Sequence, residues 1–183
     1  MKGMGSLKWR FDVSTFRLIG RDMITDRVTA LFELIKNCYD ANATEVTVVF
    51  SNVSSLNNQS SIQIIDNGVG MSFVDIRDKW MVIGTSNKRI SPYSPEPMHR
   101  RCVGEKGIGR FAVDKLGDKL TISTKKYGED SLLNVNIDWN KYYSKSNERS
   151  DELHLFTDIE NEYTYEEAAN IATSGTTLNV SEI

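Results

Sequence analysis

The order of hydrophobic patterns in the first third of the chain constrains the fold more than any other feature of the sequence. Apolar residues recur at helical spacing after Thr25, which predicts a helix over residues 23–41. Two runs rich in β-branched residues follow at 45–50 and 61–65, and a polar Ser/Asn loop separates them. A helix followed by two adjacent strands, without regular βαβ alternation, predicts helices packed on a sheet.

The rest of the chain predicts short elements on either side of one long loop. Ser72 and Asp75 have capping-box spacing and open a short helix, which we expect to continue to about Trp80 and to end near Gly84. Residues 84–106 contain all three prolines and no apolar periodicity, a pattern typical of lids, binding loops or disordered segments. The other expected elements are helices over 108–116 and 164–172 and strands over 119–124, 132–139, 153–157 and 176–180.

Length and element order together predict one α+β domain over residues 1–183, built as a two-layer α/β sandwich. The 22 basic and 25 acidic residues give a net charge of −3, which offers no field that would attract nucleic acid or an anionic membrane. Cys38 and Cys102 lie far apart in sequence and lack metal-site spacing, so we expect a reducing, cytoplasmic environment. The sequence shows neither a signal-peptide pattern nor an apolar segment long enough to cross a bilayer.

Three polar residues of the first helix, Glu33, Asn37 and Asp40, lie within about 60° of one another around the helix axis. They lie roughly opposite an apolar stripe, which consists of Val28, Leu31, Phe32 and Ile35. An ordinary surface helix shows the same division, but Asn and Asp are poor residues for a helix interior. Chemically, a carboxylate one turn from an amide can activate a water beside a metal ion that the amide oxygen binds.

The segment from Asp66 to Met71 follows the second strand and contains two glycines, Gly68 and Gly70. Asn67-Gly68 is a strong hairpin signal, although a helix start at Ser72 follows it instead of a returning strand. The alternative is a binding turn, in which Asp66 accepts a hydrogen bond from an exocyclic amine such as that of adenine, and Gly70 leaves room for the ring.

A second glycine cluster, Gly104-Glu-Lys-Gly107-Ile-Gly109, precedes the predicted helix over 108–116. Its amides and the helix N-terminus suit phosphate oxygens, with Lys106 or Arg110 adding positive charge. The cluster is not a P-loop, because no Gly-Lys-Ser/Thr ends it. A match to the dinucleotide pattern Gly-x-Gly-x-x-Ala is discounted because no buried strand precedes it, and a flexible hinge remains an alternative.

Together these segments resemble the GHKL family of ATPases, which includes gyrase B, heat-shock chaperones, histidine kinases and MutL. The resemblance spans about Met23 to Val180 and rests on four motifs in order. These are Glu33-Leu-Ile-Lys-Asn37-Cys-Tyr-Asp40-Ala41, similar to the N box, and Asp66–Met71, Gly104–Gly109 and Ser174-Gly-Thr176, similar to the three glycine boxes. The Asp-Ala pair and Gly84-Thr-Ser-Asn-Lys88 are closer to the MutL, gyrase and chaperone members than to histidine kinases.

The resemblance implies a Bergerat-type ATP-binding fold, with a mixed, largely antiparallel sheet covered on one face by helices. It implies that Glu33 is the general base and that Asn37 is the protein ligand to Mg²⁺. It also implies that Asp66 holds the adenine amino group, with help from Thr176 through a shared water, and that 84–106 is a mobile ATP lid. The other implied nucleotide-binding residues are Asp40, Ala41, Gly68, Gly70, Met71, Thr85, Ser86, Lys88, Gly104, Lys106, Gly107, Ile108, Gly109 and Arg110.

The function implied by the resemblance is Mg-ATP binding and hydrolysis that drives conformational change or homodimerisation of a larger protein. We expect an N-terminal fragment that hydrolyses ATP slowly alone, because a downstream domain supplies a lysine to the γ-phosphate in resembling proteins. Two alternatives stay open: a histidine-kinase catalytic domain and a non-hydrolysing ATP-sensing or protein-binding module. DNA repair, topology, chaperoning and defence all use this module type, so nucleic acid or a client protein would be reached through further domains.

Overall fold

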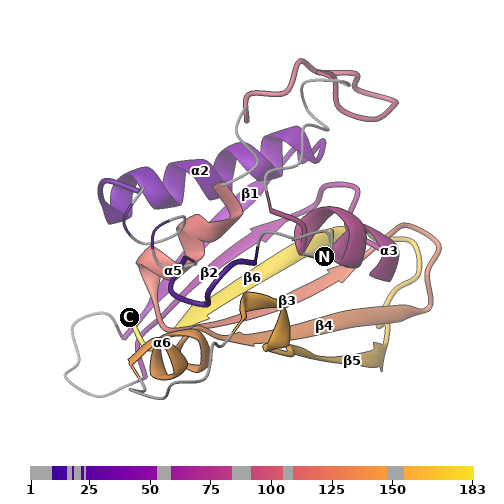
Figure 1. Cartoon of the computed structure of the whole chain (residues 1–183). Helices are drawn as coiled ribbons and strands as arrows, with labels where there is room; N and C mark the ends of the chain where they lie inside the picture. Colours follow the sequence, from indigo (N-terminus) through magenta and orange to yellow (C-terminus); the bar gives the residue numbers. More distant parts are fainter. Residues whose placement is uncertain are drawn as a thin grey trace, which may run out of the picture.

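The computed structural model describes residues 10–15, 18, 22, 24–52, 59–83, 92–104, 109–147 and 155–183, without the side chains of Arg110 and 144–147. Six strands form one sheet in the order β1-β2-β6-β3-β4-β5, and each neighbouring pair is antiparallel (Figure 1). The strands are β1 (Val46–Ser51), β2 (Ser61–Asp66), β3 (Lys119–Lys125), β4 (Ser131–Asp138), β5 (Glu162–Glu167) and β6 (Gly175–Ser181). The predicted α+β sandwich is confirmed, with a sheet that is antiparallel in all five pairings.

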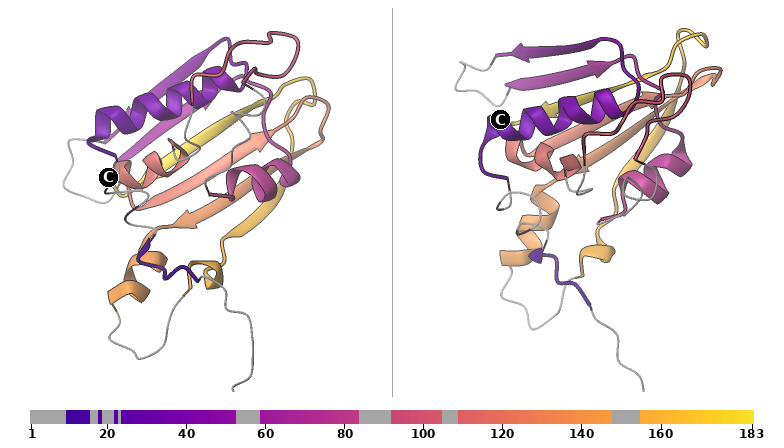
Figure 2. Two further views of the ribbon diagram at one scale, coloured as in Figure 1. Left: turned by 45° about the horizontal axis from the view of Figure 1, so that its top comes forward. Right: turned by 90° about the horizontal axis from the view of Figure 1, so that it is seen from above.

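The larger helices cover one face of this sheet (Figure 2). Helix α2 packs beside α5, and α3 lies toward the other end of the same face (Figures 1 and 2). The helical segments are α2 (Arg27–Asp40), α3 (Phe73–Asp75), the π-helix η1 (Ile76–Trp80), the 3-10 helix η2 (Gly109–Phe111), α5 (Ala112–Leu116), α6 (Asn140–Asn147) and the 3-10 helix η3 (Phe156–Asp158). None of the helices in the described part of the chain is long and apolar enough to span a membrane.

Local sequence signals explain where the first two helices begin. Asp26 caps α2 by accepting a hydrogen bond from the backbone N–H of Thr29 at 2.8 Å. Ser72 caps α3, and the reciprocal bonds between Ser72 and Asp75 form the predicted capping box. Both helices therefore start at short polar side chains that satisfy otherwise unpaired amides.

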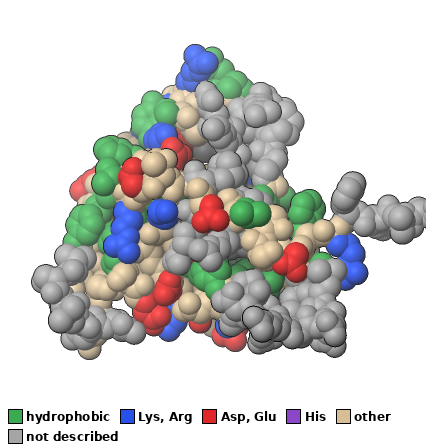
Figure 3. Space-filling model, turned by 60° about the vertical axis from the view of Figure 1, so that its left-hand side comes forward, with side chains coloured by type: hydrophobic (Ala, Val, Ile, Leu, Met, Phe, Trp, Pro, Cys, Tyr) green, Lys and Arg blue, Asp and Glu red, His purple; other side chains and the backbone are tan. Residues whose placement is uncertain are grey.

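The orientation of α2 differs from the one that its apolar stripe predicts. The buried side chains are Ala30, Leu34, Cys38 and Asp40. Val28 and Phe32 instead remain 65% and 62% exposed. Hydrophobic side chains also reach the surface among charged ones in the space-filling view (Figure 3). The packed side of α2 thus lies between the apolar stripe and the polar line, which turns Asn37 and Asp40 inward.

Two predicted elements in the C-terminal third are wrong. The predicted helix over 164–172 is replaced by β5, which pairs with β4 from Asn136↔Glu162 to Ser131↔Glu167. The predicted strand over 153–157 is not formed where it is described, because Leu155 makes one isolated bridge to Asp12 and η3 begins at Phe156. Helix α6 was not predicted, since its Lys-, Ser- and Asn-rich sequence has little apolar periodicity.

The core fills the space between the helical layer and the sheet. Its fully buried members include Leu34 from α2, Ala112 and Val113 from α5, and Ile64, Ile122 and Val180 from three central strands. These strands alternate buried and more exposed residues, as a sheet covered on one face requires.

We predict that Leu34→Ala lowers the free energy of unfolding by about 2–5 kcal/mol, because it leaves a cavity between α2 and the sheet. Phe32→Ala on the same helix is the matched control and should change stability by no more than about 0.5 kcal/mol, since the ring is largely exposed. Urea unfolding measures both. A larger loss in Phe32→Ala would show that the opposite side of α2 faces the sheet.

Candidate functional site

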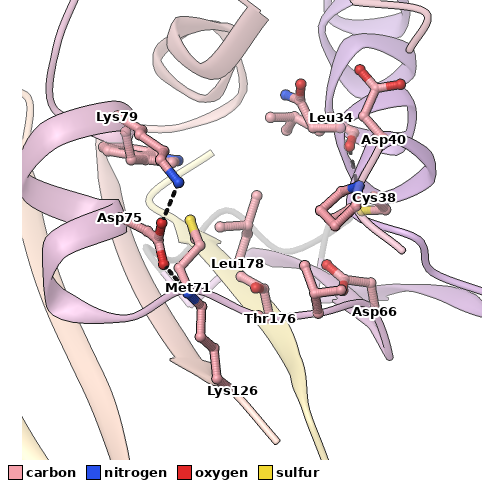
Figure 4. Close-up of a pocket in the computed structure, with 16 residues that line it drawn as sticks. Leu34, Cys38, Asp40, Asp66, Met71, Asp75, Lys79, Lys126, Thr176 and Leu178 are labelled. Carbon is pink, nitrogen blue, oxygen red and sulfur yellow. Dashed lines mark hydrogen bonds and ion pairs between the residues drawn. The ribbon is translucent and has the colours of Figure 1, made fainter. Parts of the chain in front are cut away.

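A cavity of about 360 Å³ lies between the C-terminal half of α2 and the ends of β2 and β6 (Figure 4). Helix α3 and η1 form another wall of the cavity. Its lining residues are Leu34, Asn37, Cys38, Asp40, Ala41, Asp66, Val69, Gly70, Met71, Asp75, Lys79, Trp80, Pro95, Lys126, Thr176 and Leu178. Segments that are far apart in sequence therefore meet around one space, with apolar walls and several polar groups.

Asp66 is the polar group where β2 ends in the cavity. Its Oδ1 accepts a hydrogen bond from the N–H of Gly68 at 2.8 Å, and burial raises the pKa of this carboxyl group. Burial, together with the neighbouring Asp66, raises the pKa of the Cys38 thiol to about 12. Cys38 therefore stays a protonated, apolar neighbour of an acceptor that retains capacity for another hydrogen bond.

The turn after Asp66 is not a hairpin. β2 pairs with β1 and β6, and the chain continues from the turn into α3. Asn67 instead ties the turn to the start of β1, because its Oδ1 accepts hydrogen bonds from the N–H groups of Thr44 and Glu45 at 2.9 and 3.0 Å. The hairpin alternative is thereby excluded, and the turn forms part of the cavity wall.

Two glycines let this turn pack directly against neighbouring backbone. Gly70 has a φ of +66°, and a Cβ placed on it would lie 1.9 Å from the carbonyl oxygen of Lys125. Gly175 has a φ of +147° and approaches the Asp66 backbone closely. A Cβ placed on Gly175 would lie 2.1 Å from the backbone carbonyl oxygen of Asp66. Any larger residue at either position would have to separate the ends of β2, β3 and β6.

Hydroxyl groups join the same strand ends. The hydroxyl oxygens of Thr124 and Thr176 lie 2.9 Å apart, and Thr124 Oγ1 also accepts the N–H of Met71 at 2.9 Å. Ser174 Oγ donates to the Gly68 carbonyl at 2.7 Å. The side chain of Thr176 is thus held on the cavity wall next to Asp66, its partner in the β2–β6 register.

Lys125 holds the loop that precedes Gly175. Its side chain is buried, and its ammonium group donates to the carbonyl oxygen of Thr173 at 2.5 Å. The carbonyl oxygens of Lys126, Glu129 and Ile171 lie 3.4–3.5 Å from the same nitrogen. A buried charge is costly unless polar groups surround it, and here backbone carbonyls from two loops supply that environment.

The second glycine cluster reaches Glu33 and Asn37. A Cβ placed on Gly109 would lie 3.0 Å from Glu33 Oε2 and 3.8 Å from Asn37 Nδ2. The other carboxylate oxygen of Glu33, Oε1, pairs with Lys36 Nζ at 2.5 Å, and the Glu33 side chain is 31% exposed. Glu33 is therefore oriented by Lys36 with one oxygen toward the start of η2.

Asp40 binds the backbone of the segment that precedes this glycine cluster. Its two carboxylate oxygens accept the N–H groups of Val103 and Gly104 at 2.8 and 3.1 Å. Asn42 adds a hydrogen bond from Nδ2 to the Pro95 carbonyl at 2.7 Å. The described part of the predicted lid, residues 92–104, is thus attached to the C-terminal end of α2.

The structure brings many of the predicted site residues together. Asn37, Asp40, Ala41, Asp66, Gly70, Met71 and Thr176 line the one cavity. Gly68 packs behind its wall against Ala41, while Glu33 and Gly109 adjoin Asn37. The predicted positions Thr85, Ser86, Lys88, Lys106, Gly107 and Ile108 lie outside the described residues, as does the side chain of Arg110.

Sequence reasoning missed one polar group of the cavity, formed by Asp75, Lys79 and Lys126. Asp75 and Lys79 have the i,i+4 spacing of an ion pair, which was a usable signal. Lys126 comes from the turn after β3, and no local pattern connects it to α3. Among the described residues, no group of three or more His, Cys, Asp or Glu side chains could hold a metal.

Residues 25–165 match the model of a family described as histidine kinase-, DNA gyrase B-, and HSP90-like ATPase. The chain belongs to this ATPase family. All the described residues that line the cavity up to Lys126 fall within the matched region, while Thr176 and Leu178 follow it.

Two proteins similar to this ATPase domain are a putative restriction enzyme and a DNA repair protein. The domain is 31% identical over 103 residues to a putative type II restriction enzyme HgiDII of Herpetosiphon aurantiacus, covering 56% of this chain and 15% of that protein. Its fold is similar to the crystal structure of the N terminal domain of a DNA repair protein, with a TM-score of 0.52 and 20% identity. That match covers 92% of this chain and 39% of the other. The domain thus spans less than half the length of either relative.

For this ATPase domain we predict that Gly70→Ala is more destabilising than Gly128→Ala. Both glycines have positive φ, but a Cβ on Gly128 would meet nothing within 4 Å. Gly128→Ala should therefore cost about 1–2 kcal/mol from backbone strain alone. Gly70→Ala should cost a further ~1–3 kcal/mol from the clash with the Lys125 carbonyl. Equal losses in urea unfolding would contradict the close packing of the turn.

Proposed function

We propose that this domain binds Mg-ATP in the cavity between α2, β2 and β6 and hydrolyses it slowly, driving a conformational change or dimerisation of a larger protein. The observation that carries the proposal is that Asn37 and Asp66 line the same cavity. Gly109 of the second glycine cluster lies next to Glu33 and Asn37. Membership of the ATPase family supports ATP as the ligand.

The β2 end of the cavity suits an adenine base. The Asp66 carboxylate can accept the exocyclic amine while it keeps its bond to the Gly68 amide. Met71 and Leu178 provide apolar surface for the ring, and the Thr176 hydroxyl lies on the same wall. A charged acceptor that is partly buried gives a strong hydrogen bond and rejects bases without a donor at that position.

The α2 side of the cavity suits the phosphates. The amide oxygen of Asn37 is a hard ligand of the kind that Mg²⁺ accepts, and Mg²⁺ typically completes its shell with phosphate oxygens and water. When bound, the ion would neutralise phosphate charge. One oxygen of Glu33 is held by Lys36 and the other lies toward Gly109, which supports the proposal that Glu33 accepts a proton from an attacking water.

We predict that Glu33→Gln reduces phosphate release by the full-length parent protein at least about 100-fold while leaving the affinity for Mg-ATP within about threefold. The change removes the base but preserves the size of the side chain. Glu162→Gln on β5 is the control, because that side chain is exposed and β5 contributes nothing to the cavity wall. Retained turnover in Glu33→Gln would exclude Glu33 as the base.

We predict that Asp66→Asn weakens ATP binding by at least about tenfold without destabilising the unliganded protein. Burial raises the pKa of Asp66 above its ordinary 3.8. The protonated Asp66 carboxyl group therefore stabilises the folded state fully below pH 3.8, and this stabilisation is lost as the pH rises through the folded-state pKa. At pH 7 the ionised group therefore opposes folding, and the Asn variant should unfold at an equal or higher temperature. That advantage should disappear below about pH 4. Calorimetry and thermal unfolding measure the two effects, and unchanged ATP affinity would move the base pocket elsewhere.

We also propose that the larger protein acts on nucleic acid through other domains. The support is the names of the two relatives, a putative restriction enzyme and a DNA repair protein. Phosphate release by the full-length parent protein, measured with and without duplex DNA, tests whether nucleic acid stimulates the ATPase. Stimulation by DNA would support the nucleic-acid role, and identical rates would contradict it.

A further inference from the structure

Strand β5 forms one edge of the sheet and is exposed over its whole length (Figure 1). It pairs with β4 on one side, and no other strand in the described part of the chain pairs with it. The outward N–H and C=O groups of such an edge can bind an extended chain as an additional strand. Because the side chains of β5 are exposed on both faces of the sheet, an added strand would find contacts on either face.

The charge along this edge is of one sign. Residues 158–167 contain no lysine or arginine, and all their acidic residues are exposed. These are Asp158, Glu160, Glu162, Glu166 and Glu167. Strand β1, at the opposite edge of the sheet, has no charged residue. The negative potential at β5 favours a basic partner, whereas a second copy of β5 or a nucleic acid would bring like charge against it.

Two tyrosines add apolar surface to this edge. Tyr163 and Tyr165 alternate along β5 and remain 51% and 54% exposed. Their register partners on β4, Val135 and Leu133, are buried in the core, so both rings lie on the face that the helices cover. The ring centroid of Tyr163 lies 5.0 Å from that of Phe73 and 6.0 Å from that of Tyr165. The three rings therefore form a strip from α3 to the edge of the sheet.

The inner end of this aromatic strip already contacts a cation. Arg77 Cζ lies 5.9 Å from the centroid of the Phe73 ring, within the range of a cation–π interaction. The Arg77 guanidinium also donates two hydrogen bonds to the Asp78 carboxylate, at 2.6 and 2.8 Å, which neutralises its charge. Tyr163 and Tyr165 keep exposed ring surface that lysine or arginine side chains of a partner could contact in the same way.

We propose that β5 docks an extended, lysine- or arginine-rich polypeptide segment, which joins the sheet as an additional strand. Alternate basic side chains of the segment lie against Tyr163 and Tyr165, and its remaining positive charge faces Glu166 and Glu167. Charged residues on an edge strand also limit self-association, but that role does not require two exposed tyrosines. The unpaired edge, the negative charge and the exposed rings coincide at β5, and the proposal does not depend on nucleotide binding.

The test measures the binding of fluorescent peptides to the 183-residue chain by fluorescence anisotropy. The peptides have about ten residues, enough to span the six residues of β5. The first alternates threonine and lysine, the second alternates threonine and glutamate, and the third keeps every lysine but has N-methyl groups on alternate backbone nitrogens. We expect the first to bind at least about tenfold more tightly than either of the others, because only it combines positive charge with main-chain donors.

Substitutions of exposed residues test the surface itself. Tyr163→Ser and Glu166→Gln should each weaken binding of the lysine peptide about two- to fivefold, and the loss in Glu166→Gln should shrink at high salt. The matched controls are Tyr93→Ser in the segment 92–104 and Glu45→Gln next to β1, both at exposed positions. Neither control should change the affinity.

Amide hydrogen exchange locates the bound peptide. The amides of residues 162–167 should exchange more slowly when the lysine peptide is bound, and those of residues 46–51 at the opposite edge should not change. Equal binding of the N-methylated peptide would show attraction by charge alone and would overturn the added strand. Protection at β1 in place of β5, or no binding of the lysine peptide, would overturn the docking site and leave the proposed ATP binding unaffected.

Discussion

The cavity depends on the close backbone packing around Lys125. Its carbonyl oxygen contacts Gly70, its ammonium group holds the Thr173 carbonyl, and its register partner in β6 is Gly175, which packs on Asp66. Main-chain contacts of this kind leave little freedom, because the interior is close-packed and no side chain can bend aside. One residue at the end of β3 thereby fixes the relative positions of the strand ends that carry Asp66 and Thr176.

Helix α2 connects this end of the sheet to the segment 92–104. Leu34 and Cys38 anchor the helix on the core, while Asn37 and Asp40 on the adjoining side reach the cavity and the segment ending at Gly104. The same helix therefore carries a side chain suited to a metal and one that fixes backbone near the second glycine cluster. A ligand that contacts both the α2 side and the sheet end would couple the two layers.

Sequence patterns predicted those parts of the fold whose conformation is determined by residues that are neighbours in the sequence. The capping box at Ser72, the glycine turn after Asp66 and the β-branched runs all depend on neighbours in sequence. The failures depend on distant partners. Residues 162–167 contain glutamates that favour helix, yet pairing with β4 makes them a strand. Likewise, Lys126 meets Asp75 only because the end of β3 lies beside α3, and the orientation of α2 follows from packing on the sheet rather than from its apolar stripe. The residues of the candidate site could be predicted from the sequence because its motifs resemble those of a known family. The roles of these residues stay predictions.

We propose that Asn37 and Asp66 bind opposite ends of one nucleotide. A crystal structure of the domain with Mg²⁺ and a non-hydrolysable ATP analogue would test this arrangement. We expect to find the adenine amine on the Asp66 carboxylate and the metal bound to the Asn37 amide oxygen and the phosphates. A nucleotide bound on another surface, or bound here with its base remote from Asp66, would show that the proposed arrangement is wrong.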